Sequence, residues 1–169
     1  MRPVAFAVAL IALLLAPGTP PAGATAPLAP SWELKDLDGN LHRLEDWRGK
    51  WVLLKLGTTT CPACAEQLME FDAHRDELDR LGVEVVDIYL REDRYSVRKY
   101  WERKALAFRP VILYDWKGSL LREYRVSLIP QLVLVDPEGA MVWTARYTEG
   151  SELVTVLRNW VAAGTSGGD

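Results

Sequence analysis

The hydrophobic positions of the chain change period along its length, and each change predicts a switch between strand and helix. Residues 51–56 are apolar at all positions but one, which is typical of a strand covered on both faces of a sheet. From residue 62 apolar side chains recur at helical spacing, and Gly82 is expected to end this helix. Residues 83–90 are rich in β-branched side chains and predict a second buried strand.

The same alternation continues to the end of the sequence. In chain order we expect an N-terminal hairpin over 32–47, a helix over 96–106, a strand over 111–114, a helical turn or loop over 120–126, a hairpin of two strands over 129–135 and 140–146, and a last helix capped by Ser151 and closed by Gly164. Strands that alternate with helices indicate an α/β fold with a central mixed sheet flanked by helices.

The first residues follow a different pattern. Arg2 precedes an uncharged apolar run over 4–16, and a small-x-small cleavage site follows at 22–24. This layout predicts a secretory signal peptide, because a membrane span needs about 20 apolar residues. We therefore expect export to the periplasm, with membrane attachment only if the segment is retained. The predicted organisation is a signal peptide (1–24), a linker (25–31), a folded domain (32–164) and a disordered tail (165–169).

Length and net charge limit the number of domains and the classes of macromolecule that this protein is expected to bind. The 169 residues suffice for one domain of ordinary size, and we expect a monomer. The net charge is −3, and no long basic arm or acidic tail is present. The sequence therefore gives no reason to expect a nucleic-acid partner.

The candidate chemistry lies in the only two cysteines, Cys61 and Cys64. A disulfide between them closes so small a loop that it would remove little entropy from the unfolded chain, which makes it a poor structural staple. The three-residue spacing is instead typical of a redox-active pair. The pair follows the apolar strand 51–56, at the edge where open α/β sheets place their sites.

Four features, in this order, resemble the thioredoxin superfamily, and more closely its exported branch of TlpA, ResA and cytochrome c maturation thioredoxins. They are the hairpin with Asp-Gly at 38–39, the segment Leu-Lys-Leu-Gly-Thr-Thr-Thr-Cys-Pro-Ala-Cys at 54–64, Ile129-Pro130 before a strand, and Val-Asp-Pro-Glu-Gly at 135–139. The resemblance covers residues 32 to 163 and implies a thioredoxin-like fold with a helix–strand insertion.

The resemblance also implies an activity and a set of roles. It implies a thiol–disulfide oxidoreductase that acts on protein thiols and disulfides, exchanges electrons with a redox partner protein and needs no cofactor beyond its own disulfide. Pro130 is expected to be cis and to face the cysteines, and Ile129 to offer backbone groups to an extended substrate. Cys61, just ahead of a helix, should attack as a thiolate, since unpaired N–H groups point at its sulfur. Cys64, one turn in, should resolve the mixed disulfide.

Four positions depart from the family pattern and are the candidates for tuning the thiol pKa. Thr60 stands where Trp is usual, and Pro62 puts the proline first in the dipeptide. Gln67 replaces the Glu of reducing members, and Lys55 replaces a buried Asp or Asn. As a buried cation, Lys55 would stabilise a thiolate and make the disulfide more oxidising. Alternatively it snorkels or pairs with an acid such as Glu66 or Glu84.

The residues around Cys61 are also similar to motifs of two other functional classes. Thr58-x-x-Cys61 is similar to the peroxiredoxin motif, although Leu54 stands where that motif has proline. Gly-Thr-Thr-Thr-Cys-Pro is similar to copper chaperones of the Sco type, and thiolates can hold Cu(I). Those chaperones add a late histidine, whereas the histidines here are His42 and His74. A zinc site would need two more ligands, so no metal is expected.

Overall fold

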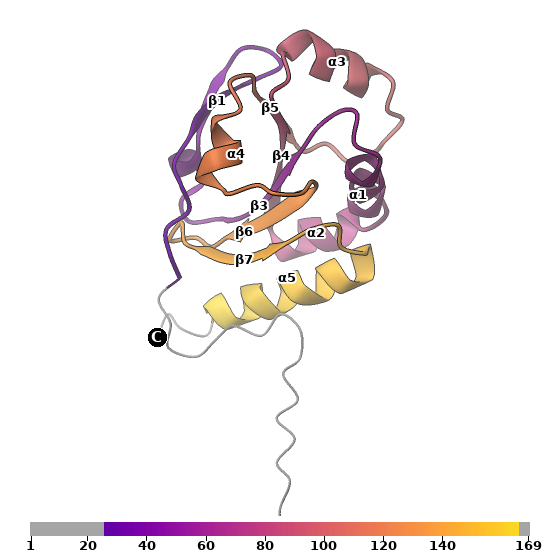
Figure 1. Cartoon of the computed structure of the whole chain (residues 1–169). Helices are drawn as coiled ribbons and strands as arrows, with labels where there is room; N and C mark the ends of the chain where they lie inside the picture. Colours follow the sequence, from indigo (N-terminus) through magenta and orange to yellow (C-terminus); the bar gives the residue numbers. More distant parts are fainter. Residues whose placement is uncertain (1–25, 166–169) are drawn as a thin grey trace, which may run out of the picture.

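The apolar run after residue 50 forms β3 (Trp51–Gly57), a strand whose seven residues are all buried. The structure, a computed structural model, describes residues 26–165. Within them β3 lies inside a seven-stranded sheet, between β4 (Val83–Leu90) and β6 (Gln131–Val135) (Figure 1). Strands buried on both faces carry the near-continuous apolar sequence seen here.

The sheet is mixed, as the sequence predicts. Its order is β2-β1-β5-β4-β3-β6-β7, with the remaining strands at β1 (Glu33–Asp36), β2 (Leu41–Arg43), β5 (Val111–Asp115) and β7 (Met141–Ala145). The core strands β3, β4 and β5 are parallel, whereas β6 pairs antiparallel with both β3 and β7. The predicted α/β class with a central mixed sheet is therefore confirmed.

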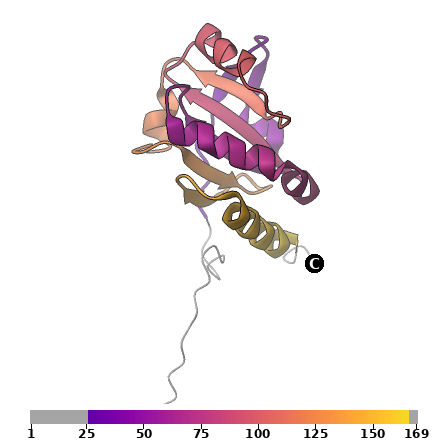
Figure 2. The ribbon, with the colours of Figure 1, turned by 90° about the vertical axis from the view of Figure 1, so that its right-hand side faces the viewer.

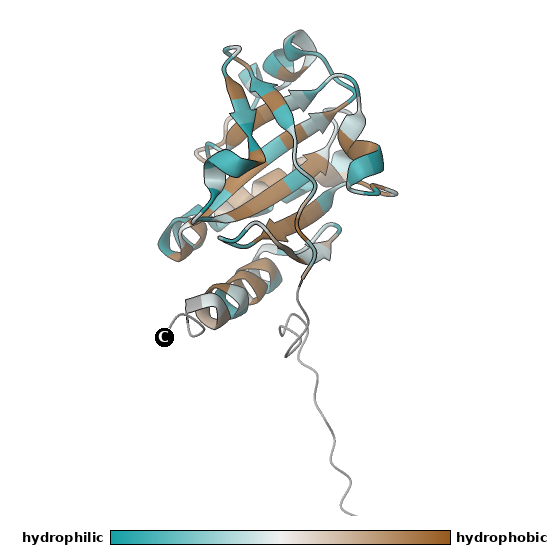
Figure 3. Ribbon diagram, turned by 90° about the vertical axis from the view of Figure 1, so that its left-hand side faces the viewer, coloured by the Kyte–Doolittle hydropathy of each residue, from teal (hydrophilic) through white to brown (hydrophobic). Residues whose placement is uncertain are grey.

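Helices cover both faces of the sheet. The apolar residues of α1 (Pro62–Ala73), α2 (Arg75–Leu81), α3 (Arg94–Glu102) and α5 (Gly150–Thr165) pack in one core cluster. Residues of α4 (Ser119–Glu123) and of the 3-10 turn η1 (Leu44–Trp47) pack in a second cluster on the other face. Figure 2 shows α1 lying across the first of these faces. Figure 3 shows apolar residues concentrated in the central strands.

Two predicted helix boundaries are wrong for identifiable reasons. The single helix expected over 62–81 breaks at His74, whose φ of −111° lies outside the helical range. The His74 ring Nδ1 lies 3.0 Å from the Glu70 carbonyl oxygen, and such local side-chain bonds compete with helix continuation. α3 begins at Arg94 instead of Ser96, because the Asp93 carboxylate caps it by accepting backbone N–H bonds.

The last helix also differs from the prediction. It starts at Gly150, one residue before the expected cap, and continues through Gly164 to Thr165. The Gly150 N–H donates to the Glu70 carboxylate at 2.9 Å, so a residue of α1 caps the start of α5. A cap supplied from 80 residues away leaves no local signal in the sequence.

The predicted linker is not a free segment where the structure describes it. Met141 N–H donates to the Pro27 carbonyl at 2.8 Å and Ala29 N–H donates to the Gly139 carbonyl at 2.9 Å, so this stretch runs along the start of β7. The predicted signal peptide lies outside the described residues, and so does the tail beyond Thr165. Within 26–165, no helix has the length and apolarity needed to span a membrane.

Candidate active site

The two cysteines form a disulfide where β3 gives way to α1. Cys61 occupies the N-cap of α1, with Pro62 at the first helical position. The Cys64 N–H donates to Cys61 Sγ at 3.1 Å, so a helix N-terminal amide points at that sulfur. Cys61 is half-buried, whereas Cys64 is 1% exposed. Cys61 is therefore the more accessible sulfur of the pair.

The predicted proline site adjoins this pair. The Ile129–Pro130 peptide bond is cis, as the resemblance implies. The Ile129 carbonyl oxygen lies 3.9 Å from Cys61 Sγ, while Pro130 itself is buried. A backbone carbonyl therefore lies next to the accessible sulfur, where an approaching polypeptide would meet it.

Lys55 lies below the disulfide and is fully buried. Its Nζ donates to Asp87 Oδ1 at 2.6 Å, and Asp87 is fully buried as well. A methyl group placed on Gly57 would lie 2.9 Å from Cys64 Sγ and 3.5 Å from Lys55 Nζ. The ammonium and the buried sulfur are therefore no more than about 6.5 Å apart, and only glycine at position 57 leaves room for this approach.

The expectation that Lys55 pairs with an acid is confirmed, but the acid is Asp87, which was not among those named. Lys55 does not snorkel, and its partner is neither Glu66, which is half-buried, nor Glu84, which pairs with Lys50 at 2.9 Å. In the parallel register Lys55 lies opposite Asp87, and Glu84 lies opposite Val52. Because successive strand residues point to opposite faces, Glu84 and Asp87 lie on different sides of the sheet.

A cluster of buried polar groups extends from Asp87 toward α3. Asp87 Oδ2 and the polar atoms of Tyr89, Tyr100 and Trp101 are buried, with no hydrogen-bond partner among residues 26–165. Burial and the Asp87 carboxylate raise the pKa of Tyr89 well above its usual range. Burial, with Asp87 and Glu92, raises the pKa of Tyr100 to about 12. Sequence reasoning missed this cluster, although Asp87 interrupts one apolar strand as Lys55 interrupts the other.

The loop before Cys61 is held by a residue that the sequence did not single out. Glu92, just beyond β4, accepts the Thr59 N–H at 2.9 Å and the Thr59 hydroxyl at 2.6 Å. Position 60 is an exposed threonine, so no aromatic side chain from this position covers the cysteines. The Thr58 hydroxyl lies 3.5 Å from the Thr60 hydroxyl. The carboxylate of Glu92 thus fixes the loop between β3 and the pair.

Gln67 is fully buried and faces the C-terminal part of the chain. Its Nε2 donates to the Thr148 carbonyl at 3.0 Å, and the Thr148 N–H donates to its Oε1 at 2.8 Å. This reciprocal pair ties α1 to the loop that precedes α5. A role in tuning the thiols stays a prediction, as it does for Thr60 and Pro62.

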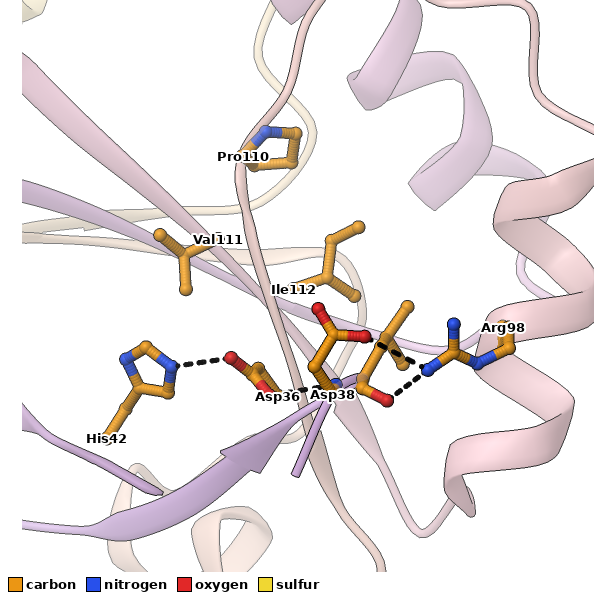
Figure 4. A pocket seen from close by; sticks show the side chains of 8 residues that line it. Asp36, Asp38, His42, Arg98, Pro110, Val111 and Ile112 are labelled. Atoms are coloured by element: carbon orange, nitrogen blue, oxygen red, sulfur yellow. Dashed lines mark hydrogen bonds and ion pairs between the residues drawn. The ribbon is translucent and has the colours of Figure 1, made fainter. Parts of the chain in front are cut away.

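A cavity of about 390 Å³ lies at the N-terminal hairpin, and its lining includes neither cysteine (Figure 4). His42 Nε2 lies 3.0 Å from Asp36 Oδ2, and Arg98 donates to Asp38 and to the Leu37 carbonyl. Burial favours a higher pKa for Asp36, but its hydrogen bonds to His42 and neighbouring amides outweigh this and hold that pKa well below its usual range. The polar groups that line this cavity thus form hydrogen bonds and ion pairs with one another and with neighbouring backbone groups.

Neither histidine approaches the cysteines. His42 lies in the cavity of Figure 4, and His74 contacts the Glu70 carbonyl at the end of α1. Among residues 26–165, no group of three or more His, Cys, Asp or Glu side chains could hold a metal ion.

Comparisons with known proteins agree with this geometry. The sequence model described as "AhpC/TSA family" matches residues 26–144. The chain is 34% identical over 111 residues to the thiol-disulfide oxidoreductase ResA of Geobacillus kaustophilus, across 66% of this chain and 63% of that protein. It is 28% identical over 140 residues to ResA of Bacillus subtilis, across 83% of this chain and 77% of that one.

Solved structures share the architecture. A crystal structure of a thiol:disulfide interchange protein DsbE from Chlorobium tepidum aligns with a TM-score of 0.70 at 21% identity, covering 83% of this chain and 97% of that one. This likeness confirms the thioredoxin-like fold. The match to the Geobacillus relative spans slightly less than two thirds of that protein's length.

Proposed function

The chain belongs to the AhpC/TSA family of thioredoxin-superfamily proteins, and from this premise we propose that it is a thiol–disulfide oxidoreductase acting on protein substrates. One observation carries the proposal. The accessible Cys61 is disulfide-bonded to the buried Cys64 at the start of a helix, and the Ile129 carbonyl lies 3.9 Å from its sulfur. Related proteins named thiol-disulfide oxidoreductases support it.

The reaction consists of two thiol–disulfide exchanges. In the reduced protein the Cys61 thiolate attacks a client disulfide, forms a mixed disulfide and releases one client sulfur as a thiolate. Cys64 loses its proton and attacks Cys61 Sγ, which releases the second client sulfur and closes the Cys61–Cys64 disulfide. Two electrons pass to the client, whose sulfurs take up two protons. The same steps run in reverse when the pair is oxidised and the client is a dithiol.

Lys55 influences the thiol pKa and the reduction potential of the Cys61–Cys64 pair. An ammonium within about 6.5 Å of Cys64 Sγ would attract a thiolate there by at least about 2.5 kcal/mol at an effective dielectric constant of 20, and the Asp87 carboxylate offsets part of this. Stabilising the thiolate lowers the thiol pKa and makes the disulfide more oxidising. Pro62 and Thr60 act on the accessible sulfur from the first turn of α1 and the loop before it, and Gln67 acts through the position of α1.

The clients and the compartment follow from the resemblance and the leader-like N-terminus. The protein is exported to the periplasm, works as a monomer, and exchanges electrons with protein clients and with one redox partner protein. An apocytochrome c cysteine pair is the client class that the cytochrome c maturation branch implies. No cofactor is needed besides the Cys61–Cys64 disulfide.

The test uses two cysteine variants of the mature protein. We expect Cys61→Ser to abolish reduction of a model protein disulfide, because the attacking sulfur is gone. Cys64→Ser should instead accumulate mixed disulfides with clients, because nothing resolves them. Full activity in Cys61→Ser would overturn the proposal. Rapid peroxide consumption by the reduced wild type would favour a thiol peroxidase, and stoichiometric Cu(I) retention would favour a copper carrier.

The direction of electron flow is decided by one further measurement. The reduction potential of the pair is read from equilibrium with a glutathione buffer. A value near about −270 mV indicates a reductant, and a value near about −120 mV indicates an oxidant.

A further inference from the structure

A groove with a volume of about 300 Å³ lies between the loop that precedes the cis-proline and strand β7. We call it the arginine groove. Its lining includes Arg125, Leu128, Gln131, Met141 and Arg146. None of its nine lining residues is acidic, although the chain as a whole has a net charge of −3.

The arginine groove adjoins the reactive sulfur. Leu128 lines it and directly precedes Ile129, whose carbonyl oxygen lies 3.9 Å from Cys61 Sγ. Gln131 lines it immediately after Pro130. An extended polypeptide advances about 3.3 Å per residue. A client cysteine bonded to Cys61 would therefore bring residues two or three positions away to this groove.

The walls of the groove are fixed by hydrogen bonds. Gln131 Nε2 donates to the Tyr124 carbonyl at 3.1 Å, and the Tyr124 hydroxyl donates to the Pro30 carbonyl at 2.7 Å. Arg125 has a positive φ of 49°, which a side-chain-bearing residue adopts at a cost. These contacts fix the backbone of the loop beside the groove, and the exposed Arg125 side chain extends from it without a partner among the described residues.

The charges of the groove have no partner of their own. Arg125 and Arg146 are exposed, and within residues 26–165 neither side chain makes an ion pair or a hydrogen bond. The nearby Glu123 does not line this groove; it lines an adjoining hollow that Arg125 also borders, and the two side chains form no ion pair there. Leu128, 51% exposed, adds an apolar side chain to the lining of the groove.

We propose that the arginine groove binds the client segment flanking the reactive cysteine and selects clients with acidic side chains there. The inference rests on the proposed oxidoreductase function and names its substrate class. A guanidinium pairs with a carboxylate through two parallel hydrogen bonds, which gives both charge and geometric selectivity. Because both arginines are exposed, the selection weakens as salt screens the charges.

The experiment compares two nine-residue peptides, each with one central cysteine in a mixed disulfide with a small neutral thiol. One carries Asp and the other Lys at the second and third positions on both sides of the cysteine. We expect the reduced wild type to cleave the Asp peptide with a kcat/KM at least about tenfold higher at low salt, which corresponds to about 1.4 kcal/mol. The preference should shrink in 0.5 M salt, an ionic strength with a Debye length of roughly 4 Å.

Two variants separate the groove from the overall charge of the protein. Arg125→Glu/Arg146→Glu should lose or reverse the preference, whereas Arg80→Glu/Arg158→Glu, which makes the same change of net charge at exposed positions of α2 and α5, should keep it. Competition between the two peptides for trapping by Cys64→Ser gives a second readout that needs no turnover. Equal cleavage of both peptides by the wild type, or a preference that survives in Arg125→Glu/Arg146→Glu, overturns the inference and leaves the oxidoreductase function intact. Failure to reduce either peptide or a model protein disulfide overturns both.

Discussion

Two lysine–carboxylate pairs join β4 to β3 and to the residue directly before β3, and one pair is exposed whereas the other is buried. Lys50 and Glu84 meet at 2.9 Å, with side chains 55% and 42% exposed. Lys55 and Asp87 meet at 2.6 Å, and both are fully buried. The chemistry of the two pairs is the same, so the comparison isolates what burial does to an ion pair.

The exposed pair is expected to contribute little. Water and salt screen it, and such pairs are typically worth about 0–1 kcal/mol. The buried pair cost several kcal/mol of lost hydration per ion to form, and its own attraction has to offset that cost. Asp87 Oδ2, moreover, has no hydrogen-bond partner among the described residues. A pair this costly directly below a disulfide is better explained by its effect on the sulfurs than by its effect on stability.

The largest effect is expected from Asp87→Ala. This change leaves the Lys55 ammonium buried without its counter-ion, which typically costs about 3–5 kcal/mol. Urea unfolding of the oxidised protein should show the loss as a lower midpoint. A loss below about 1 kcal/mol would mean that water reaches the pair, and the contrast with the exposed pair would disappear.

The matched control for Asp87→Ala removes both charges. Lys55→Met/Asp87→Leu should recover most of the stability lost in the single variant, because replacing a buried pair by apolar side chains is often neutral or stabilising. If the double variant is as unstable as Asp87→Ala, the damage comes from lost packing and not from the unpaired charge.

The next effect concerns the redox poise. Lys55→Met removes the ammonium that lies within about 6.5 Å of Cys64 Sγ, so a thiolate in the Cys61–Cys64 pair is less favoured. We expect the thiol pKa to rise by about one unit, equivalent to about 1.4 kcal/mol, and the reduction potential to fall by about 30 mV. Titration of thiolate absorbance and equilibration with glutathione measure the two. An unchanged pKa and potential would remove Lys55 from the function.

A smaller effect is expected from the titration of Tyr89, which belongs to the same buried polar cluster as Asp87. The pKa of Tyr89 is raised by burial and by Asp87, so this hydroxyl contributes stability below the ordinary tyrosine pKa of about 10 that is lost as the pH rises further. Unfolding free energies measured from pH 9 to 11 should therefore fall with pH, and Tyr89→Phe should flatten the curve. Equal slopes in the two proteins would contradict the assignment.

The smallest effect is expected from Glu84→Gln. Removing the exposed pair should change the unfolding free energy by less than about 1 kcal/mol, and by less still in 1 M salt. A loss comparable to that of Asp87→Ala would show that exposure does not distinguish the two pairs.

Local pattern alone sufficed for the strand 51–56, for the alternation of strands and helices that indicates an α/β fold, and for the cysteine pair at the start of a helix, since each depends on neighbours in sequence. The partner of Lys55 could not be predicted, because it depends on the register between two strands, where a shift of one residue changes the face. The cap of α5 by Glu70 could not be predicted either, because the two residues are 80 positions apart and meet only in the folded chain. The break at His74 rests on a local contact with the Glu70 carbonyl, which the hydrophobic periodicity does not reveal.

Side chains of α1, the helix that carries the disulfide, form hydrogen bonds to the start of the C-terminal helix α5 and to the residue before Glu149. Gln67 holds Thr148 by two hydrogen bonds, and Glu70 holds Gly150. The helix that carries the disulfide therefore cannot tilt or slide without breaking bonds to a segment about 80 residues later. A nascent chain that has not yet released residues 148–150 has both cysteines but lacks this brace, so the position of α1 is fixed only after synthesis has passed the start of α5.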